Sequence, residues 1–287
     1  MTRLAFLGTG LIGGALAEAA AKRGDDVVAW NRTRTRAEAL QEFGVEVRAT
    51  PAGAVRGVER VHLAFPDDEV IEKVLAPVLG EVAEEAVIVD HTTASPAKTA
   101  ARGRRLAADG VRYLHAPVLM SPASCREATG MMLVSGPESV YRDVVDGLEE
   151  MTGSVRYLGD DMGRAAGFKL FGNATIVSLI GGLADVFAMA AELDIAPDDA
   201  FSLFDDFDPS GVMGYRGKSM SEGEYAPAFT LEMARKDVGL MLETADDEPL
   251  AVLPGLAQRM DELIAEGHGD KDLGVLAVDS VPPDDGS

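Results

Sequence analysis

The chain has 287 residues, 47% of them hydrophobic, and a formal net charge of −22. This length allows one large domain or two of ordinary size, with enough apolar residues for a real core. The acidic excess argues against nucleic acid and anionic membranes as partners, and the single cysteine, Cys125, excludes an internal disulfide. The first residues enter a strand without a signal-peptide pattern, so we expect a cytoplasmic protein.

A glycine-rich turn follows the first predicted strand, residues 4–7. It reads Gly8-Thr9-Gly10-Leu11-Ile12-Gly13 and leads directly into a predicted helix. In this context Gly8 allows a tight turn, Gly10 lets the backbone approach a pyrophosphate, and Gly13 allows close helix–strand packing. The helix N-terminus would supply N–H groups to the phosphates. We therefore predict that the whole turn binds a dinucleotide.

The second predicted strand, residues 26–30, ends in Asn31-Arg32-Thr33. An NAD-binding fold usually places an acid here, on the ribose 2′-hydroxyl. An amide, a guanidinium and a hydroxyl instead suit a 2′-phosphate, so the sequence favours NADP(H) over NAD(H). The alternative is that the arginines of residues 32–36 are solvated at a helix start with the capping box Thr35-x-x-Glu38.

Predicted strands continue at residues 61–65, 86–89, 111–114, 131–134 and 155–158, with helices between them. Strands that alternate with helices predict an α/β fold, here a Rossmann doubly wound sheet with all of these strands in one sheet. Ligands of such sheets bind beyond the carboxyl ends of the strands. Pro66, Thr93 and the segment that begins at His115 are predicted to lie there.

The second half is predicted to be helical, with a long helix at residues 162–194 and shorter ones near 197–207, 230–244 and 254–265. The long helix is apolar nearly all round, which implies burial on every side and suggests a homodimer or homotetramer. Its longest uncharged piece, residues 170–184, is short and rich in Gly, Asn, Thr and Ser, so we expect no membrane span.

Lys169 is a lone lysine near the start of this helix, and burying it is costly without a reason. Asn173 follows one turn later on the same face. The two side chains together could hold one small polar molecule. Alternatively, Lys169 extends to solvent and Asn173 simply packs.

Four ordered motifs resemble the β-hydroxyacid dehydrogenase family, which includes 3-hydroxyisobutyrate dehydrogenase, glyoxylate/succinic semialdehyde reductases and 6-phosphogluconate dehydrogenase. The glycine turn with residues 31–33 resembles the NADP-preferring form. Asp90-x-Thr92-Thr93-x-x-Pro96 is similar to a loop whose threonine lies at the nicotinamide. Lys169 with Asn173 resembles the catalytic pair. Phe229 with Lys236-Asp237 resembles a segment that closes over cofactor and substrate.

The resemblance implies a dinucleotide-binding domain at residues 1–161 and a helical substrate and dimerisation domain at 162–280. The composition of residues 281–287 predicts a disordered tail. The resemblance also implies Lys169 as proton donor in reduction and acceptor in oxidation, with Asn173 orienting the substrate oxygen. Pro66, Thr93 and Lys236 would contact the cofactor. Phe229 and Asp237 would contact a small hydroxy acid or aldehyde.

The substrate loop departs from the family pattern. The usual D-A-P-V-S-G-G is replaced by His115-Ala-Pro-Val-Leu119-Met120-Ser121. Leu119 and Met120 would crowd a carboxylate cradle, so a bulkier or less anionic carbonyl substrate is predicted. An imine reductase, or a non-catalytic NADP-binding protein, is the alternative function. His91, His115 and Cys125 are left without a role, and their spacing predicts no metal site.

Overall fold

The computed structural model describes residues 1–283, which form two compact units. The first unit comprises residues 1–174, and the second begins at Thr175. The two units meet within one long helix, whereas the predicted domain boundary lies at its start. Of the predicted tail, residues 284–287 lie outside the described residues, while the carbonyl of Val281 accepts a hydrogen bond from Tyr225.

Six parallel strands form the main sheet of the first unit, in the order β3-β2-β1-β4-β5-β6. They are β1 (Arg3–Leu7), β2 (Asp26–Trp30), β3 (Glu46–Val47), β4 (Arg60–Leu63), β5 (Val87–Asp90) and β6 (Arg112–His115). The strand order reverses between β1 and β4, and such a reversal opens a crevice at the carboxyl ends of those strands. The predicted Rossmann fold is confirmed.

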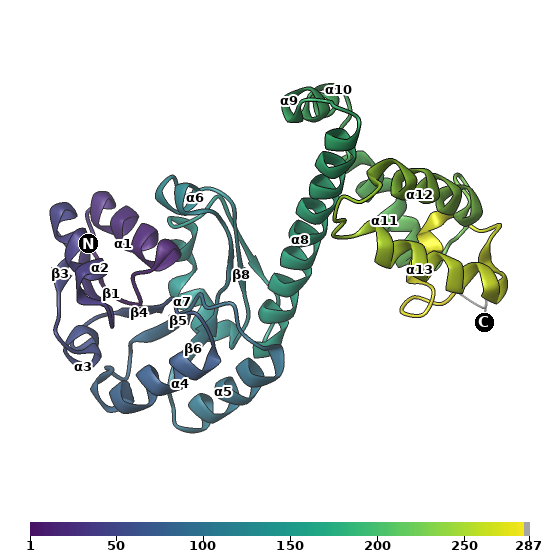
Figure 1. Cartoon of the computed structure of the whole chain (residues 1–287). Helices are drawn as coiled ribbons and strands as arrows, with labels where there is room; N and C mark the ends of the chain where they lie inside the picture. Colours follow the sequence, from purple (N-terminus) through teal and green to yellow (C-terminus); the bar gives the residue numbers. More distant parts are fainter. Residues whose placement is uncertain (284–287) are drawn as a thin grey trace. The chain divides into compact units, whose positions relative to one another are not determined.

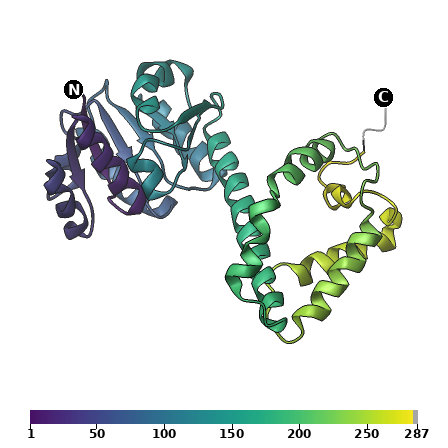
Figure 2. The same cartoon turned by 90° about the horizontal axis from the view of Figure 1, so that it is seen from above.

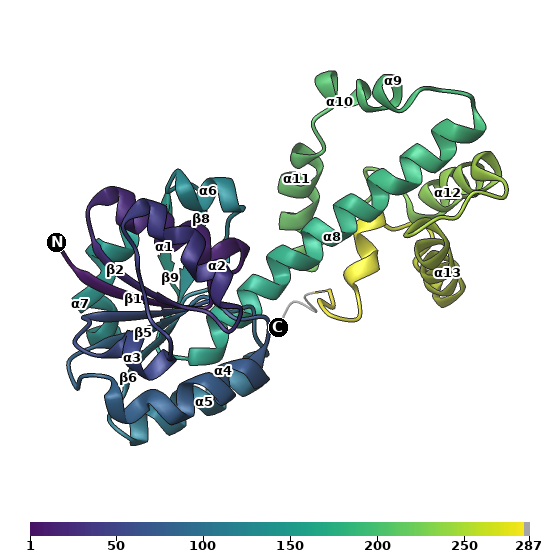
Figure 3. The ribbon, with the colours of Figure 1, turned by 60° about the vertical axis from the view of Figure 1, so that its left-hand side comes forward.

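Helices cover both faces of this sheet, because alternate residues of β1 point to opposite sides. Leu4 and Phe6 pack toward α1 (Leu11–Arg23), α6 (Pro122–Arg126) and α7 (Glu138–Glu149). Ala5 and Leu7 pack toward α3 (Pro51–Val55), α4 (Asp68–Leu75) and α5 (Pro96–Ala108). Figures 1 and 3 show α1 on one side of the sheet and α4 with α5 on the other. The short α2 (Arg34–Glu38) and two 3-10 helices, Ala39–Phe43 and Ala76–Glu81, complete this part.

The prediction that all strands share one sheet is wrong. A separate three-stranded sheet contains β7 (Val118–Leu119), β8 (Met131–Val134) and β9 (Ser154–Tyr157). An isolated antiparallel bridge between His115 and Ser135 is where the two sheets touch. The ladder from β6 ends there because Pro117 has no N–H to donate and the chain turns into β7.

The second unit is helical, as predicted. The long helix α8 (Met162–Glu192) enters it from the first unit, followed by α9 (Pro197–Phe201), α10 (Leu203–Asp206), α11 (Ser210–Ser221), α12 (Leu231–Ala245) and α13 (Leu253–Leu263). A π-turn, Ile264–His268, and a 3-10 helix, Leu273–Ala277, end it. The core of this unit lies between α12 and α13, which run side by side (Figure 2), and includes Leu231, Val238 and Leu263. The sequence did not predict α11.

The buried charge of α8 in the second unit has a structural role. Asp185 is 1% exposed, and its carboxylate accepts hydrogen bonds from the backbone N–H groups of Ala251, Val252 and Leu253. These amides begin α13, where carboxylates are favoured by the free N–H groups and the helix dipole. Asp185 therefore joins α8 to α13.

By length and composition, α8 is the one described helix long and apolar enough to cross a membrane. Its first turns, however, pack in the first unit through Met162, Ala165 and Ala166, and Asp185 packs near its other end. Between these two contacts, only 11% of its most apolar 18-residue stretch is buried within the structure. The absence of a membrane partner remains a prediction.

The middle of α8 exposes a run of large apolar side chains. Ile176, Val177, Leu179 and Ile180 are 54%, 70%, 55% and 63% exposed. Contiguous exposed apolar surface of this kind marks an interaction site. We expect a dimer or larger assembly, with a mass by light scattering of at least about twice 30.2 kDa. Val177→Glu should shift the protein toward monomer, and a parent that is monomeric at micromolar concentration would contradict the prediction.

Candidate cofactor and active site

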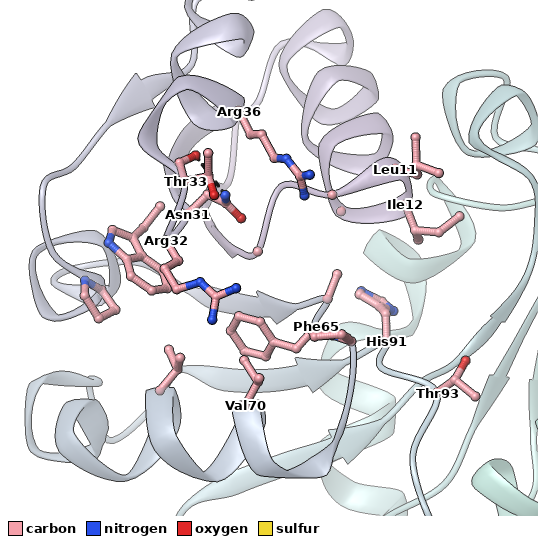
Figure 4. A pocket seen from close by; sticks show the side chains of 18 of the residues that line it. Leu11, Ile12, Asn31, Arg32, Thr33, Arg36, Phe65, Val70, His91 and Thr93 are labelled. Atoms are coloured by element: carbon pink, nitrogen blue, oxygen red, sulfur yellow. Dashed lines mark hydrogen bonds between the residues drawn. The ribbon is translucent and has the colours of Figure 1, made fainter.

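A pocket of about 750 Å³ lies at the carboxyl ends of the central strands, entirely within the first unit (Figure 4). Its volume is in the range of small-molecule and cofactor sites. Most of the predicted residues of this unit line it: Gly8, Gly10, Leu11, Ile12, Gly13, Asn31, Arg32, Thr33, Pro66, Thr93, Met120 and Lys169. The structure thus brings the glycine turn, the residue 31–33 segment and the lysine to one cavity.

The three glycines of the turn are required for different reasons. Gly8 has φ +91°, and a Cβ there would lie 2.3 Å from the carbonyl oxygen of Ala64. A Cβ on Gly13 would lie 2.1 Å from the oxygen of Gly8. A Cβ on Gly10 would have no atom within 4 Å, and this residue lines the pocket. A ligand can therefore approach the backbone closely at Gly10, where a side chain would intrude.

The N-terminus of α1 faces this turn without a side-chain cap, so its first N–H groups are free to bind an anion. Thr9 lies behind the turn rather than in the pocket, and its N–H donates to Oδ1 of Asn31 at 3.0 Å. Nδ2 of Asn31 in turn donates to the carbonyl of Thr33 at 2.9 Å. Asn31 therefore holds the glycine turn against the segment predicted to recognise the ribose.

Three cations line the pocket near this segment: Arg32, Arg36 and Lys73. Figure 4 shows the guanidinium groups of Arg32 and Arg36 pointing into the cavity. Within the described residues none of the three forms an ion pair, although their neighbour Arg34 pairs with Glu38 at 2.7 Å. Unpaired cations gathered in one cavity of a chain with charge −22 favour a phosphate ligand.

Two details of this region differ from expectation. The capping box Thr35-x-x-Glu38 does not form, because the helix begins at Arg34 and Glu38 pairs with Arg34. Lys73 was missed, because the sequence does not show which face of α4 borders the pocket. The one sequence feature that could have identified Lys73 is its position in the helix that follows Pro66.

The loop from Asp90 to Pro96 is held firmly below the pocket. Asp90 is fully buried and accepts hydrogen bonds from the N–H of Thr92 at 3.0 Å and from the hydroxyl of Tyr113 at 2.8 Å. The hydroxyl of Thr92 accepts from the N–H of Phe65 at 3.1 Å, which ties the loop to the end of β4. Thr93 is left exposed on the pocket wall, as a residue at the nicotinamide end would need to be.

A buried arginine ties the same loop to the start of α4. Arg102 on α5 bonds to Asp68 at 2.6 Å and lies 3.6 Å from Asp90. Asp68 also accepts from the N–H of Ser95 at 2.9 Å. Although burial acts in the opposite direction, Tyr113 and the neighbouring carboxylates raise the pKa of Arg102, so the guanidinium stays charged. Two walls of the pocket are fixed relative to one another by this network.

Lys169 reaches the pocket from the second turn of α8 and is half-buried. Burial lowers the pKa of its ammonium, and within the described residues no carboxylate pairs with it. The alternative in which Lys169 extends to open solvent is therefore disfavoured. Asn173 is also half-buried but does not line the pocket, so the structure places the lysine, and not the amide, at the cavity.

Side chains of the substrate loop face in two directions, because successive residues of a strand such as β7 point to opposite sides. Val118 and Met120 line the pocket. Leu119 packs instead against α8, where a Cβ on Gly172 would lie 2.9 Å from its side chain. Ser121 caps α6 by accepting from the N–H of Ser124 at 3.0 Å. Of the three predicted substrate residues of the loop, Met120 alone borders the cavity.

The remaining predicted residues lie in the second unit. Phe229 is held by its N–H, which donates to Asp272 at 3.1 Å, and Lys236 pairs with its neighbour Asp237 at 2.8 Å. Their contacts with cofactor and substrate remain predictions. Cys125 is buried in the core of the first unit, where burial raises the pKa of its thiol to about 11, so it is unreactive.

Residues 3–159, more than half of the chain, match the family model described as the NAD binding domain of 6-phosphogluconate dehydrogenase. The chain belongs to the β-hydroxyacid dehydrogenase family. It is thus an NAD(P)-binding oxidoreductase of this family, with the glycine turn at the start of the matched region.

Known relatives differ in length. The chain is 24% identical to glyoxylate/succinic semialdehyde reductase 1 of Arabidopsis thaliana, over 95% of this chain and 96% of the relative. It is 25% identical to the cytokine-like nuclear factor N-PAC of Anopheles gambiae, over 96% of this chain but 50% of that protein. The chain thus spans about half the length of this relative.

Solved structures share the fold at lower identity. An imine reductase from Myxococcus stipitatus in complex with NADP⁺ superposes with a TM-score of 0.89 and 19% identity, over 96% of this chain and 99% of that one. Likeness at this identity establishes the two-part fold and leaves the reaction to be argued from the pocket.

Proposed function

We propose that this protein is an NADP(H)-dependent oxidoreductase that interconverts a carbonyl compound and the corresponding hydroxy compound, with Lys169 as the proton donor and acceptor. The observation that carries the proposal is Lys169 itself. It is a half-buried ammonium without a carboxylate partner among the described residues, and it lines the same cavity as the uncapped glycine turn.

Each part of the pocket has a proposed task. The glycine turn and the N-terminus of α1 would hold the pyrophosphate, and the cations at positions 32, 36 and 73 would hold the 2′-phosphate. Thr93 would contact the nicotinamide end. The bound cofactor supplies or accepts the hydride. Lys169 would donate a proton to the developing alkoxide in reduction and take it back in oxidation.

The substrate end is more apolar than the family pattern. Val118 keeps the residue of the family pattern, whereas Met120 lines the pocket where that pattern has a glycine, so a thioether side chain would crowd a carboxylate cradle. We propose a carbonyl substrate with an apolar substituent. Aldehydes, including semialdehydes, have the same reactive carbonyl group. Turnover of a panel of aldehydes, keto acids and imines, each with NADPH and with NADH, tests the reaction. Absence of turnover with every carbonyl compound would contradict it.

Imine reduction is the second candidate. Met120 and Val118 would accept a bulky imine, and solved imine reductases share the fold. Lys169 argues for carbonyl chemistry, because family resemblance assigns a lysine at this place to alkoxide protonation. Preferred turnover of imines in the same panel would favour this candidate. NADPH binding without any turnover would favour a non-catalytic role.

Replacing Met120 tests the substrate end. We expect Met120→Gly to improve turnover of small 3-hydroxy acids or their semialdehydes, because it removes a side chain from the wall of the cavity that Lys169 also lines. Leu119→Ser is the matched control: it should leave this selectivity unchanged and lower stability by less than the roughly 2–5 kcal/mol of a fully buried leucine, because Leu119 is partly buried. Good activity of the unaltered protein on 3-hydroxyisobutyrate would show that Met120 does not restrict the site.

A further inference from the structure

His91 lies on the wall of the pocket, directly after Asp90 and two residues before Thr93. Both nitrogens of its ring are engaged. Nδ1 lies 2.7 Å from the carbonyl oxygen of Ala116, and Nε2 lies 2.9 Å from Nδ1 of His62. His62 is fully buried on β4. Its ring stacks on that of Phe6, with centroids 4.7 Å apart, and lies edge to edge with the ring of His91, the two planes differing by 6°.

These contacts determine which nitrogens carry hydrogen. A carbonyl oxygen can only accept, so Nδ1 of His91 must donate to Ala116. In a neutral ring Nε2 of His91 is then an acceptor, and Nδ1 of His62 must donate to it. Burial lowers the pKa of both rings, in keeping with two neutral imidazoles. The result is one directed chain of hydrogen bonds, from His62 through His91 to Ala116.

This chain crosses between the two loops that form the reactive end of the pocket. Ala116 begins the segment that carries Val118 and Met120, and His91 begins the segment that carries Thr93. The backbones of these segments are joined by one bond, from the N–H of Ala116 to the carbonyl of Asp90 at 2.7 Å. The ring of His91 adds a second connection, through its bond to the carbonyl of Ala116.

We propose that His91 is a positioning residue that sets the distance between the Thr93 loop and the substrate loop, and that His62 fixes the orientation of its ring. The proposal rests on the proposed function of the pocket. It gives His91 no part in proton transfer, because both of its nitrogens are directed at protein groups. Lys169 remains the proton-transfer residue.

The first test measures the loops directly and does not depend on turnover. Hydrogen–deuterium exchange of the parent, His91→Phe and His91→Asn is followed in peptides that cover residues 91–96 and 116–121. His91→Phe removes both bonds and should speed exchange in both segments at least several-fold. His91→Asn keeps a donor near Nδ1 and should restore slow exchange. Equal protection in the parent and His91→Phe would overturn the proposal.

His115→Phe is the matched control. His115 is also fully buried, but neither nitrogen of its ring has a hydrogen-bond partner among the described residues, and it does not line the pocket. Because His115 directly precedes residues 116–121, it is a control for residues 91–96 alone, where exchange should stay unchanged. If His91→Phe does not fold, His62→Phe makes the same comparison, because it keeps the aromatic stack and removes one bond.

Nitrogen-15 spectra of the ring nitrogens supply a second readout. The chain has four histidines, so the signals can be assigned by single replacements. His62 and His91 should both carry their hydrogen on Nδ1. Finding it on Nε2 of His91 would overturn the proposed orientation.

Kinetics with the best carbonyl substrate then tests the effect on the reaction. His91→Phe should lower kcat by roughly 10- to 100-fold, the usual cost of a small misplacement at a reacting centre. NADPH affinity should change little, because the phosphate groups are held elsewhere. Losses no larger than those of His115→Phe would contradict a positioning role. If the parent turns over no substrate, the proposed function fails, and the exchange and nitrogen-15 results still decide the role of His91.

Discussion

Lys169→Met is expected to lower turnover by roughly 10²–10⁴-fold, the usual contribution of a positioned general acid or base. Methionine keeps the length and apolar stem of the side chain and removes the exchangeable proton. The fold should survive, because methionine is a good helix former and is less costly to bury than an ammonium. NADPH affinity should change little, because the glycine turn and the cations hold the phosphates.

The pH dependence of the parent should carry the signature of the same residue. Burial lowers the pKa of Lys169 below its ordinary value of 10.5. Reduction needs the protonated amine, so its rate should fall as pH rises through this lowered pKa. Oxidation needs the neutral amine, so its rate should rise over the same range. Lys169→Met should abolish both dependences, as measured by kcat/KM against pH in each direction.

Lys98→Met is a suitable control, because Lys98 is an exposed lysine on α5 outside the pocket. It should leave turnover unchanged. Turnover of Lys169→Met within a few-fold of the parent would end the catalytic assignment and favour imine reduction. Loss of the folded state would indicate that Lys169 is structural.

Arg32→Asp is expected to weaken NADPH binding by about tenfold or more, because a charge-assisted hydrogen bond contributes about 1.5–3 kcal/mol and the new carboxylate repels the 2′-phosphate. NADH binding should be unchanged or improved, since a carboxylate at this position can accept from the ribose hydroxyl. The only tryptophan of the chain, Trp30, lines the pocket, so its fluorescence reports the binding of both cofactors.

Variants of the neighbouring cations refine this test. Arg36→Ala and Lys73→Ala should each weaken NADPH by a smaller factor and leave NADH unchanged. Arg34→Ala serves as the control, because Arg34 pairs with Glu38 and does not line the pocket. A parent that binds NADH more tightly than NADPH would show that Asn31-Arg32-Thr33 has been misinterpreted.

Features that depend on local pattern could be predicted from the sequence alone. The sequence of residues 4–23 predicts a strand, a tight turn and a helix in that order. The turn needs glycine at positions 8 and 13, because a side chain there would collide with the backbone. The apolar run after Met162 predicts a long helix for a similar reason: its length and composition suit no other element. Lys169 was identifiable because a single charge in such a run is costly to bury.

Which side chains meet depends instead on how distant segments pack. Lys73 joins Arg32 and Arg36 because α4 presents that face to the crevice, and no local pattern in α4 states which face this is. Leu119 turns away from the pocket and Met120 toward it, because side chains alternate along a strand and one residue of register exchanges them. His62 and His91 are 29 residues apart in the sequence, and they bond because β4 and β5 are neighbours in the sheet. Contacts of this kind depend on register and packing between segments, which the spacing of residues along one segment does not specify.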